Sequence, residues 1–194
     1  MPTTLLTLFV KFWKRLDWAV FDWIQHRNGT LWTVILYVSR DLTSLGNGLA
    51  YLFTFLVFAT LLLANQHRTA WAFLITMAAT AGLVASIKLL VGRPCPLQPD
   101  PYQKCRTGAL MRGHSFPVPH LPCMPSGHTC AAVVLYGIVA SLIPYPCQDW
   151  AFWWGFSLGV VVGFTRIILS AHWTSDVVAG FALGHLLLAA WRWV

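Results

Sequence analysis

The sequence has few charged residues and contains no glutamate. Only 10% of its 194 residues are charged, whereas 57% are hydrophobic and 11 are tryptophans. Soluble domains usually carry about 25% charged residues, so this composition excludes an ordinary soluble protein. We therefore predict an integral membrane protein.

Patterns that bind metals are missing as well. The stretch 92–127 contains three of the five cysteines together with His114 and His120, but no CxxC or HxxxH spacing joins them. Zinc sites normally show such spacing, and no pair of carboxylates is placed to hold Mg²⁺. We predict that the protein uses no metal and no cofactor.

The three cysteines of this stretch are Cys95, Cys105 and Cys123. If the loop that carries them faces an oxidising compartment, a disulfide is expected there. Three thiols allow three single pairings, and the sequence does not choose among them.

The net charge of +7 comes from 13 lysines and arginines against 6 aspartates. In a soluble protein this excess would suggest nucleic acid. In a membrane protein it is better explained by basic residues at lipid headgroups. We expect the bilayer, and no nucleic acid, as the partner.

Five apolar runs are candidates for helices that cross the membrane. They occupy residues 49–64, 70–91, 128–143, 150–169 and 177–194. We predict one all-α domain over residues 1–194, a polytopic transmembrane helical bundle whose spans lie within 49–194. Five full spans are expected.

Residues 1–45 follow a different pattern. Apolar residues recur at helical spacing between Leu5 and Trp23, while lysines, an arginine and aspartates interrupt them. This pattern indicates an amphipathic helix that lies in the membrane interface rather than a first span. A second apolar run, at 31–38, is too short to cross the membrane unless its polar flanks are included. A sixth span is therefore the alternative to five. Nothing here resembles a cleaved signal peptide.

Ionisable residues near the span ends are predicted to gather on one membrane face. The spans 128–143 and 150–169 separate the loop 92–127 from the connection 170–176, so both segments emerge on the same side. Ionisable residues in membrane segments are candidates for functional sites. His185, inside the last span, is instead interpreted as a helix-packing residue with a hydrogen-bonded partner. The residues that can meet are Lys88, Arg93, Ser126, His128, Arg166, His172 and Asp176.

The sequence Pro-Ser-Gly-His ends this loop at Pro125 to His128 and begins an apolar helix. Ser126 is a good N-cap, and the free amides at Gly127 and His128 make the helix end a site for anions. Gly127 has no side chain to obstruct a close approach, and His128 can donate a proton near neutral pH. Taken alone, the motif is better explained by ordinary capping.

A second cluster changes that interpretation. Arg166, His172 and Asp176 are spaced so that the aspartate can hydrogen-bond one ring nitrogen of His172 and leave the other as a nucleophile. An arginine fork can grip two phosphate oxygens. Lys88 and Arg93 add positive charge, so the residues together indicate a phosphate site with an acid and a nucleophile.

At these residues the chain resembles the type 2 phosphatidic acid phosphatase superfamily, which also includes lipid phosphate phosphatases and vanadium haloperoxidases. The family pattern is Lys-x6-Arg-Pro, then Pro-Ser-Gly-His, then Ser-Arg-x5-His-x3-Asp. The second part matches fully, and the third matches with Thr165 in place of serine. In the first part Cys95 takes the place of the arginine, and Arg93 lies two residues earlier; we favour Arg93 reaching the phosphate by a shifted turn.

The resemblance implies a metal-free phosphatase of lipid monophosphates or diphosphates that works through a phosphohistidine. It implies that His172 attacks phosphorus, Asp176 orients His172 and His128 protonates the leaving oxygen. Five groups would hold the phosphate oxygens: Lys88, Arg93, Ser126, the Gly127 amide and Arg166. The substrate, among polyprenyl diphosphate, phosphatidic acid, phosphatidylglycerol phosphate and lipid A phosphates, stays open.

The charge pattern and the family resemblance predict different membrane faces for the site. Counting basic residues places the loop 92–127 in the cytoplasm, whereas bacterial members of the family suggest a periplasmic or outer face of the inner membrane. We predict the outer face, which also suits the three loop cysteines. The proline-rich loop 94–125 is either a lid over the site or an inert connector.

Two other functions remain as alternatives. A phosphotransferase would use the same phosphohistidine and pass phosphate to a second molecule. The other alternative is a catalytically inactive protein that binds phospholipid, because Cys95 stands where the family has an arginine. The presence of both histidines and Asp176 argues against it. A transporter is disfavoured, because no inverted repeat or broken helix is visible.

Overall fold

The regular structure of the chain is helical wherever it is described. The computed structural model describes residues 5–43, 48–96, 122–143, 148–191 and 193. Within these ranges it has seven helices and no strand, which confirms the predicted all-α class. The helices are α1 (Leu5–Gln25), α2 (Thr30–Leu42), α3 (Gly48–Leu63), α4 (His67–Val91), α6 (Gly127–Ser141), α7 (Gln148–Ile168) and α8 (Thr174–Trp191).

The five predicted apolar runs correspond to α3, α4, α6, α7 and α8, each within three residues of the predicted bounds. By length and composition, α4 and α8 are the described helices that could cross a membrane. The apolar helices α3 and α6, and residues Trp153–Ile168 of α7, are shorter. The number of spans, five or six, therefore stays a prediction.

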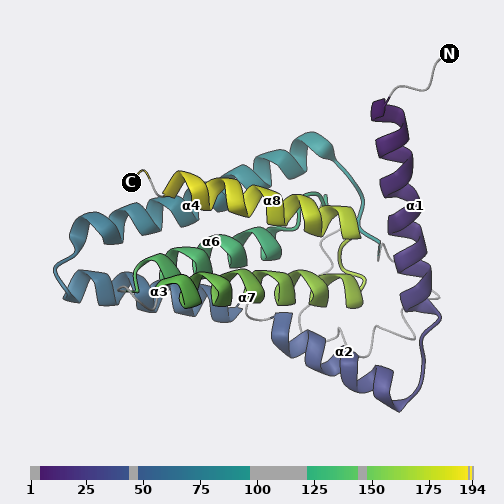
Figure 1. Cartoon of the computed structure of the whole chain (residues 1–194), viewed down its shortest axis with the longest axis horizontal. Coiled ribbons are helices and arrows are strands. Elements are labelled where there is room, and N and C mark those ends of the chain that lie inside the picture. The colour runs from purple at the N-terminus through teal and green to yellow at the C-terminus, as the bar shows by residue number, and fades with distance from the viewer. Residues whose placement is uncertain (1–4, 44–47, 97–121, 144–147, 192, 194) are drawn as a thin grey trace.

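Helix α6 is the centre of the bundle. It packs most extensively against α7 and α8, and it also contacts α4 and α3. Figure 1 shows these helices running roughly along a common direction. Val133, Val134, Leu135 and Ile138 of α6 are almost completely buried. The first turn of α6, which carries the Pro-Ser-Gly-His motif, is thereby held at one end of the bundle.

The outer helices expose apolar side chains rather than polar ones. Leu52 and Phe55 of α3, Trp71 and Ile75 of α4, and Leu186 of α8 are each more than half exposed. A helix that is apolar on its outer face is stable in hydrocarbon and not in water. This surface is consistent with the predicted contact with lipid.

Helix α1 lies across one end of the bundle (Figure 1). Leu5, Leu8 and Phe9 on this helix are exposed, whereas Asp17 and Ile24 are buried. The crosswise direction is the one expected of an interfacial helix. Whether residues 1–45 lie in the interface or include a first span stays a prediction.

Gly180 allows α8 to approach the turn that begins α6. A Cβ atom at this position would lie 2.4 Å from the carbonyl oxygen of Ser126. Real Cβ atoms do not come so close to backbone oxygen, and the neighbour here is backbone that cannot rotate away. Any larger residue would therefore separate α8 from the Ser126 turn.

Gly180→Ala is expected to lower the free energy of unfolding by about 1–3 kcal/mol, as overpacking does. Gly82→Ala in α4 is the matched control, because a Cβ there meets nothing within 4 Å. The control should leave stability unchanged or raise it slightly, since alanine favours helix. Unfolding of the detergent-purified variants measures both effects, and equal stability of the two would contradict the close approach.

Candidate active site

Ser126 caps α6, as predicted. Its side chain accepts hydrogen bonds from the backbone N–H and the hydroxyl of Thr129. Its own backbone N–H donates to the carbonyl oxygen of Asp176 over 2.9 Å. Ser126 is completely buried. The first turn of α6 is therefore fixed to the first turn of α8.

His172 lies in the short connection between α7 and α8, and Asp176 lies in the first turn of α8. The Asp176 carboxylate is completely buried. It accepts a hydrogen bond from the backbone N–H of Trp173 over 3.0 Å and one from Arg93 over 2.9 Å. These bonds hold the carboxylate beside the connection that carries His172.

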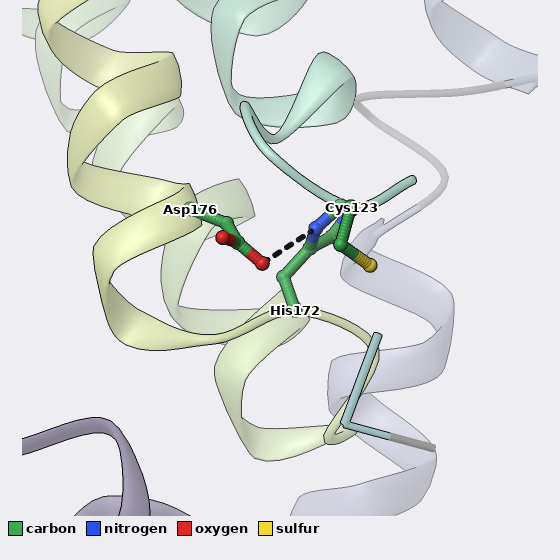
Figure 2. Close-up of side chains that lie close together, drawn as sticks. All are labelled: Cys123, His172 and Asp176. Carbon is green, nitrogen blue, oxygen red and sulfur yellow. Dashed lines mark ion pairs between the residues drawn. The ribbon is translucent and has the colours of Figure 1, made fainter. Parts of the chain in front are cut away.

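The Asp176 carboxylate points toward the His172 ring, as Figure 2 shows. The distance from Oδ2 to Nδ1 is 3.7 Å, longer than a hydrogen bond. Catalytic hydrogen bonds often shorten only when substrate binds. With Nδ1 toward Asp176, Nε2 on the opposite edge of the ring is the nitrogen left for nucleophilic attack.

The second predicted histidine faces the first. The ring centroids of His128 and His172 are 6.4 Å apart. His128 lies on α6 directly after Ser126 and Gly127, so the capped helix end and the two imidazoles share one site. The structure thus brings these residues together at one end of the bundle, and their placement at one membrane face stays a prediction.

Burial lowers the pKa of the His172 imidazole below its ordinary value. The positive charges of Arg166 and Lys88 lower this pKa further, and the carboxylate of Asp176 opposes the shift. Since His172 is 6% exposed, removal from water dominates. The neutral imidazole, which is the nucleophilic form, is thus favoured at neutral pH.

An apolar cavity of about 470 Å³ leads to these residues from between α3, α4 and α6. Lys88, Gly127 and His128 line it. Most of its other lining consists of small or apolar residues such as Ala81 and Met77. The cavity thus joins an apolar space to the cationic and acid groups of the site.

Arg166 has unused hydrogen-bonding capacity. Its Nη1 donates to the Thr43 hydroxyl over 3.2 Å, but its buried Nε has no hydrogen-bond partner within the described residues. A buried N–H without a partner costs about 1–3 kcal/mol. A bound anion would supply the missing acceptor.

Arg93 has a different set of partners from the one predicted. Its guanidinium pairs with Asp17 over 2.6 Å and with Asp176 over 2.9 Å, and it contacts the face of Trp173. It therefore joins a carboxylate of α1 to the carboxylate at the start of α8. Its role as a phosphate ligand stays a prediction.

Cys95 and Cys123 form a disulfide, the pairing that the sequence left open. The disulfide joins the turn after α4 to the segment before α6, where the Cys123 N–H also donates to the Arg93 carbonyl over 2.7 Å. Most of the loop 94–125 lies outside the described residues, including Cys105, His114 and His120. The structure therefore tests neither the predicted lid nor a metal site at these three residues.

Cys123, His172 and Asp176 place potential metal ligands within 4.8 Å of one another. Figure 2 shows Cys123 beside the His172 ring. The cysteine is in a disulfide and has no thiolate to offer, so two side chains remain. Zinc usually takes at least three protein ligands, and this group does not fit one.

Sequence reasoning missed Asp17. This residue is 2% exposed and binds the site from α1, although the sequence suggests a polar residue on the outside of an amphipathic helix.

The prediction for His185 is confirmed, because its Nδ1 lies 2.9 Å from the Phe181 carbonyl oxygen and its ring packs on Phe156 and Phe181.

Comparisons with known proteins found a matching family and a similar solved structure. The model of the PAP2 superfamily matches residues 69–194, a range that contains every predicted site residue. The solved structure of a transmembrane PAP2 type phosphatidylglycerolphosphate phosphatase from Bacillus subtilis is similar, with a TM-score of 0.71 and 18% identity. The similarity covers 98% of this chain and 95% of that one. No curated protein matches the chain.

If His172 is the nucleophile that the resemblance implies, its lowered pKa predicts the pH dependence of turnover. Activity should persist below the ordinary histidine pKa of about 6.5 and fall only as the pH passes through the lowered value, where the ring gains its proton. Lys88→Gln removes a positive charge that lowers this pKa, so the acid limb of kcat/KM should move to higher pH. If the acid limb of kcat/KM arose instead from ionisation of the free substrate, Lys88→Gln would leave it at the same pH.

The disulfide predicts a specific loss of stability. The double variant Cys95→Ser/Cys123→Ser should unfold more easily by about 2–4 kcal/mol, because a loop closed across 28 residues is released in the unfolded chain. Cys105→Ser, which removes the third cysteine of the same loop, should have no comparable effect. Unfolding under non-reducing conditions measures both variants. An equal loss in Cys105→Ser would contradict the pairing.

Proposed function

The chain belongs to the PAP2 superfamily, and from this membership and the geometry of the site we propose that it is a membrane phosphatase of lipid phosphates. The reaction uses a phosphohistidine and no metal. The observation that carries the proposal is the pair of neighbouring imidazoles, His128 and His172, whose ring centroids lie 6.4 Å apart. His128 also lines an apolar cavity together with Lys88.

The first step transfers the phosphoryl group to the protein. Nε2 of His172 attacks phosphorus, the bond to the leaving oxygen breaks, and His128 gives that oxygen a proton. Asp176 holds Nδ1–H and stabilises the positive charge that develops on the ring. In the second step water attacks phosphorus, His128 takes its proton, and phosphate leaves with His172 neutral again.

Cations and helix amides hold the phosphate during both steps. Lys88 and the Gly127 amide lie at the cavity, and Arg166 has a buried N–H that a phosphate oxygen would satisfy. Positive groups fixed in advance stabilise charge on the transferring group without reorganising. Ser126 supports the amide end of α6 as its cap, for which its hydroxyl oxygen accepts hydrogen bonds. We propose that the O–H of the same hydroxyl donates to a phosphate oxygen.

We propose that no metal takes part, because the donors near His172 are already engaged. Asp176 already binds Arg93 and the Trp173 amide, and Cys123 is in a disulfide. The cationic side chains perform the charge stabilisation that a metal supplies in other phosphoryl transfers. Chelators should therefore leave turnover intact, and vanadate, which mimics the transition state, should inhibit.

The substrate is proposed to be a lipid, because the cavity lining is mostly apolar and opens between helices that expose apolar side chains. The similar Bacillus subtilis protein is a phosphatidylglycerolphosphate phosphatase, which makes that lipid one member of the panel to test. Phosphatidic acid, polyprenyl diphosphate and lipid A phosphates are the others. The disulfide suits a site on the periplasmic or outer face of an inner membrane.

His172→Ala should reduce release of phosphate from the best lipid of this panel by about 10³-fold or more, since the nucleophile is lost. His185→Phe is the matched control: it removes an imidazole from α8 that binds its own helix, and it should retain activity. Release is measured from detergent-purified protein with EDTA present.

The remaining outcomes separate the alternatives. Release that appears only with an added acceptor molecule indicates a phosphotransferase. Lipid binding with no turnover in either condition indicates an inactive binding protein. Inhibition by EDTA would overturn the metal-free reaction, and full activity of His172→Ala would overturn the assignment of the nucleophile.

A further inference from the structure

Helix α1 contributes one buried carboxylate to the surroundings of the site. Asp17 is 2% exposed, whereas Asp22, one turn further along the same helix, is exposed. Oδ1 of Asp17 accepts the backbone N–H of Ser175 over 2.9 Å. Oδ2 accepts the Ser175 hydroxyl and Nη2 of Arg93, each over 2.6 Å. Both oxygens are therefore engaged.

The bond to the Ser175 N–H caps α8 from outside the helix. Ser175 is the second residue of α8, and amides in the first turn of a helix have no partner within it. A carboxylate at this end is also favoured by the helix dipole. Asp17 thus fixes the first turn of α8 at Ser175, the residue before Asp176.

Arg93 extends the same support to the catalytic carboxylate itself. Its Nη2 binds Asp17 and its Nη1 binds Asp176, so one guanidinium holds both buried carboxylates. Loss of either partner of a buried ion pair leaves a charge uncompensated. Without Asp17, Asp176 would be the carboxylate left to balance the charge of Arg93, and this is the carboxylate that also faces His172.

Further contacts of α1 border the His172 connection on either side. Trp18 and Phe21 pack on Trp173, with ring centroids 5.1 Å and 5.6 Å away. Gln25 donates to the Ser170 hydroxyl over 3.2 Å. Helix α1 therefore spans the segment from Ser170 to Ser175, with His172 in its middle.

We propose that Asp17 is a positioning residue for the reaction, which sets the orientation of His172 by dividing Arg93 between two carboxylates and capping α8. The family model begins at residue 69, so this support comes from a part of the chain outside the matched range. The inference rests on the proposed function for its kinetic consequence, though not for its structural one.

The test compares Asp17→Asn with Asp22→Asn, which changes the same residue type on the exposed side of α1. Asp17→Asn keeps an acceptor for the Ser175 N–H but loses the charge that Arg93 binds. We expect kcat to fall about 10- to 100-fold, as for other residues that orient a catalytic group, with KM within about twofold. Asp22→Asn should match the wild type.

A double-mutant cycle separates positioning from simple destabilisation. If Asp17 acts through Asp176, then Asp17→Asn should cost less than about twofold in an Asp176→Asn background. The same loss in both backgrounds would overturn the proposal. If Asp17→Asn does not fold, Ser175→Ala tests the same network from the other side, because the Ser175 hydroxyl donates to Asp17 and accepts from Arg93. A severalfold lower kcat is expected, and an unchanged kcat would also overturn the proposal.

A readout without turnover keeps this test apart from the proposed function. In protein labelled with ¹⁵N-histidine, the signals of His172 are identified by their loss in His172→Ala. Asp17→Asn should shift the His172 ring-nitrogen signals and Asp22→Asn should not. Shifted signals in an enzyme that releases no phosphate would refute the function and keep the positioning role, whereas unshifted signals would refute the positioning role alone.

Discussion

A carboxylate sealed from solvent at the start of α8 is the constraint on which the rest of the site depends. Asp176 has no exposed surface, and a buried charge is tolerated only with partners. Its carboxylate binds Arg93 after α4 and the Trp173 amide before α8, while its carbonyl oxygen binds Ser126 before α6. Three segments that are distant in sequence are joined at one residue.

This junction explains why the site combines polar chemistry with an apolar bundle. The charges and capped helix ends are gathered at one end of α6, and the remainder of that helix is buried among apolar neighbours. Lys88, Gly127 and His128 then mark where the apolar cavity meets the charged groups. The lipid phosphate of the proposed function would meet both environments at once.

Much of the arrangement could be predicted from the sequence. Long apolar runs locate the bundle helices, because a helix in hydrocarbon needs apolar residues on every outward position. Counting those helices places the loop before Ser126 and the connection after Arg166 at one end. The cap formed by Ser126 follows from a local rule, since it depends only on the residues that begin α6.

Interactions between distant segments could not be predicted in the same way. The spacing from Lys88 to Arg93 describes the turn after α4, but it does not reveal that Asp17 competes for the guanidinium. Asp17 itself resembles any charge in an amphipathic helix with lysines around it. The choice of Cys123 over Cys105 as partner of Cys95 depends on where the chain returns to α6, which no local pattern encodes.

The bond between Asp17 and Ser175 joins residues 158 positions apart. During synthesis the aspartate is made before its partners at the start of α8. Until then Asp17 has no amide to cap, and Arg93 has no second carboxylate to bind. A chain that has been made only as far as α7 therefore lacks the groups at the start of α8 that Asp17 and Arg93 bind.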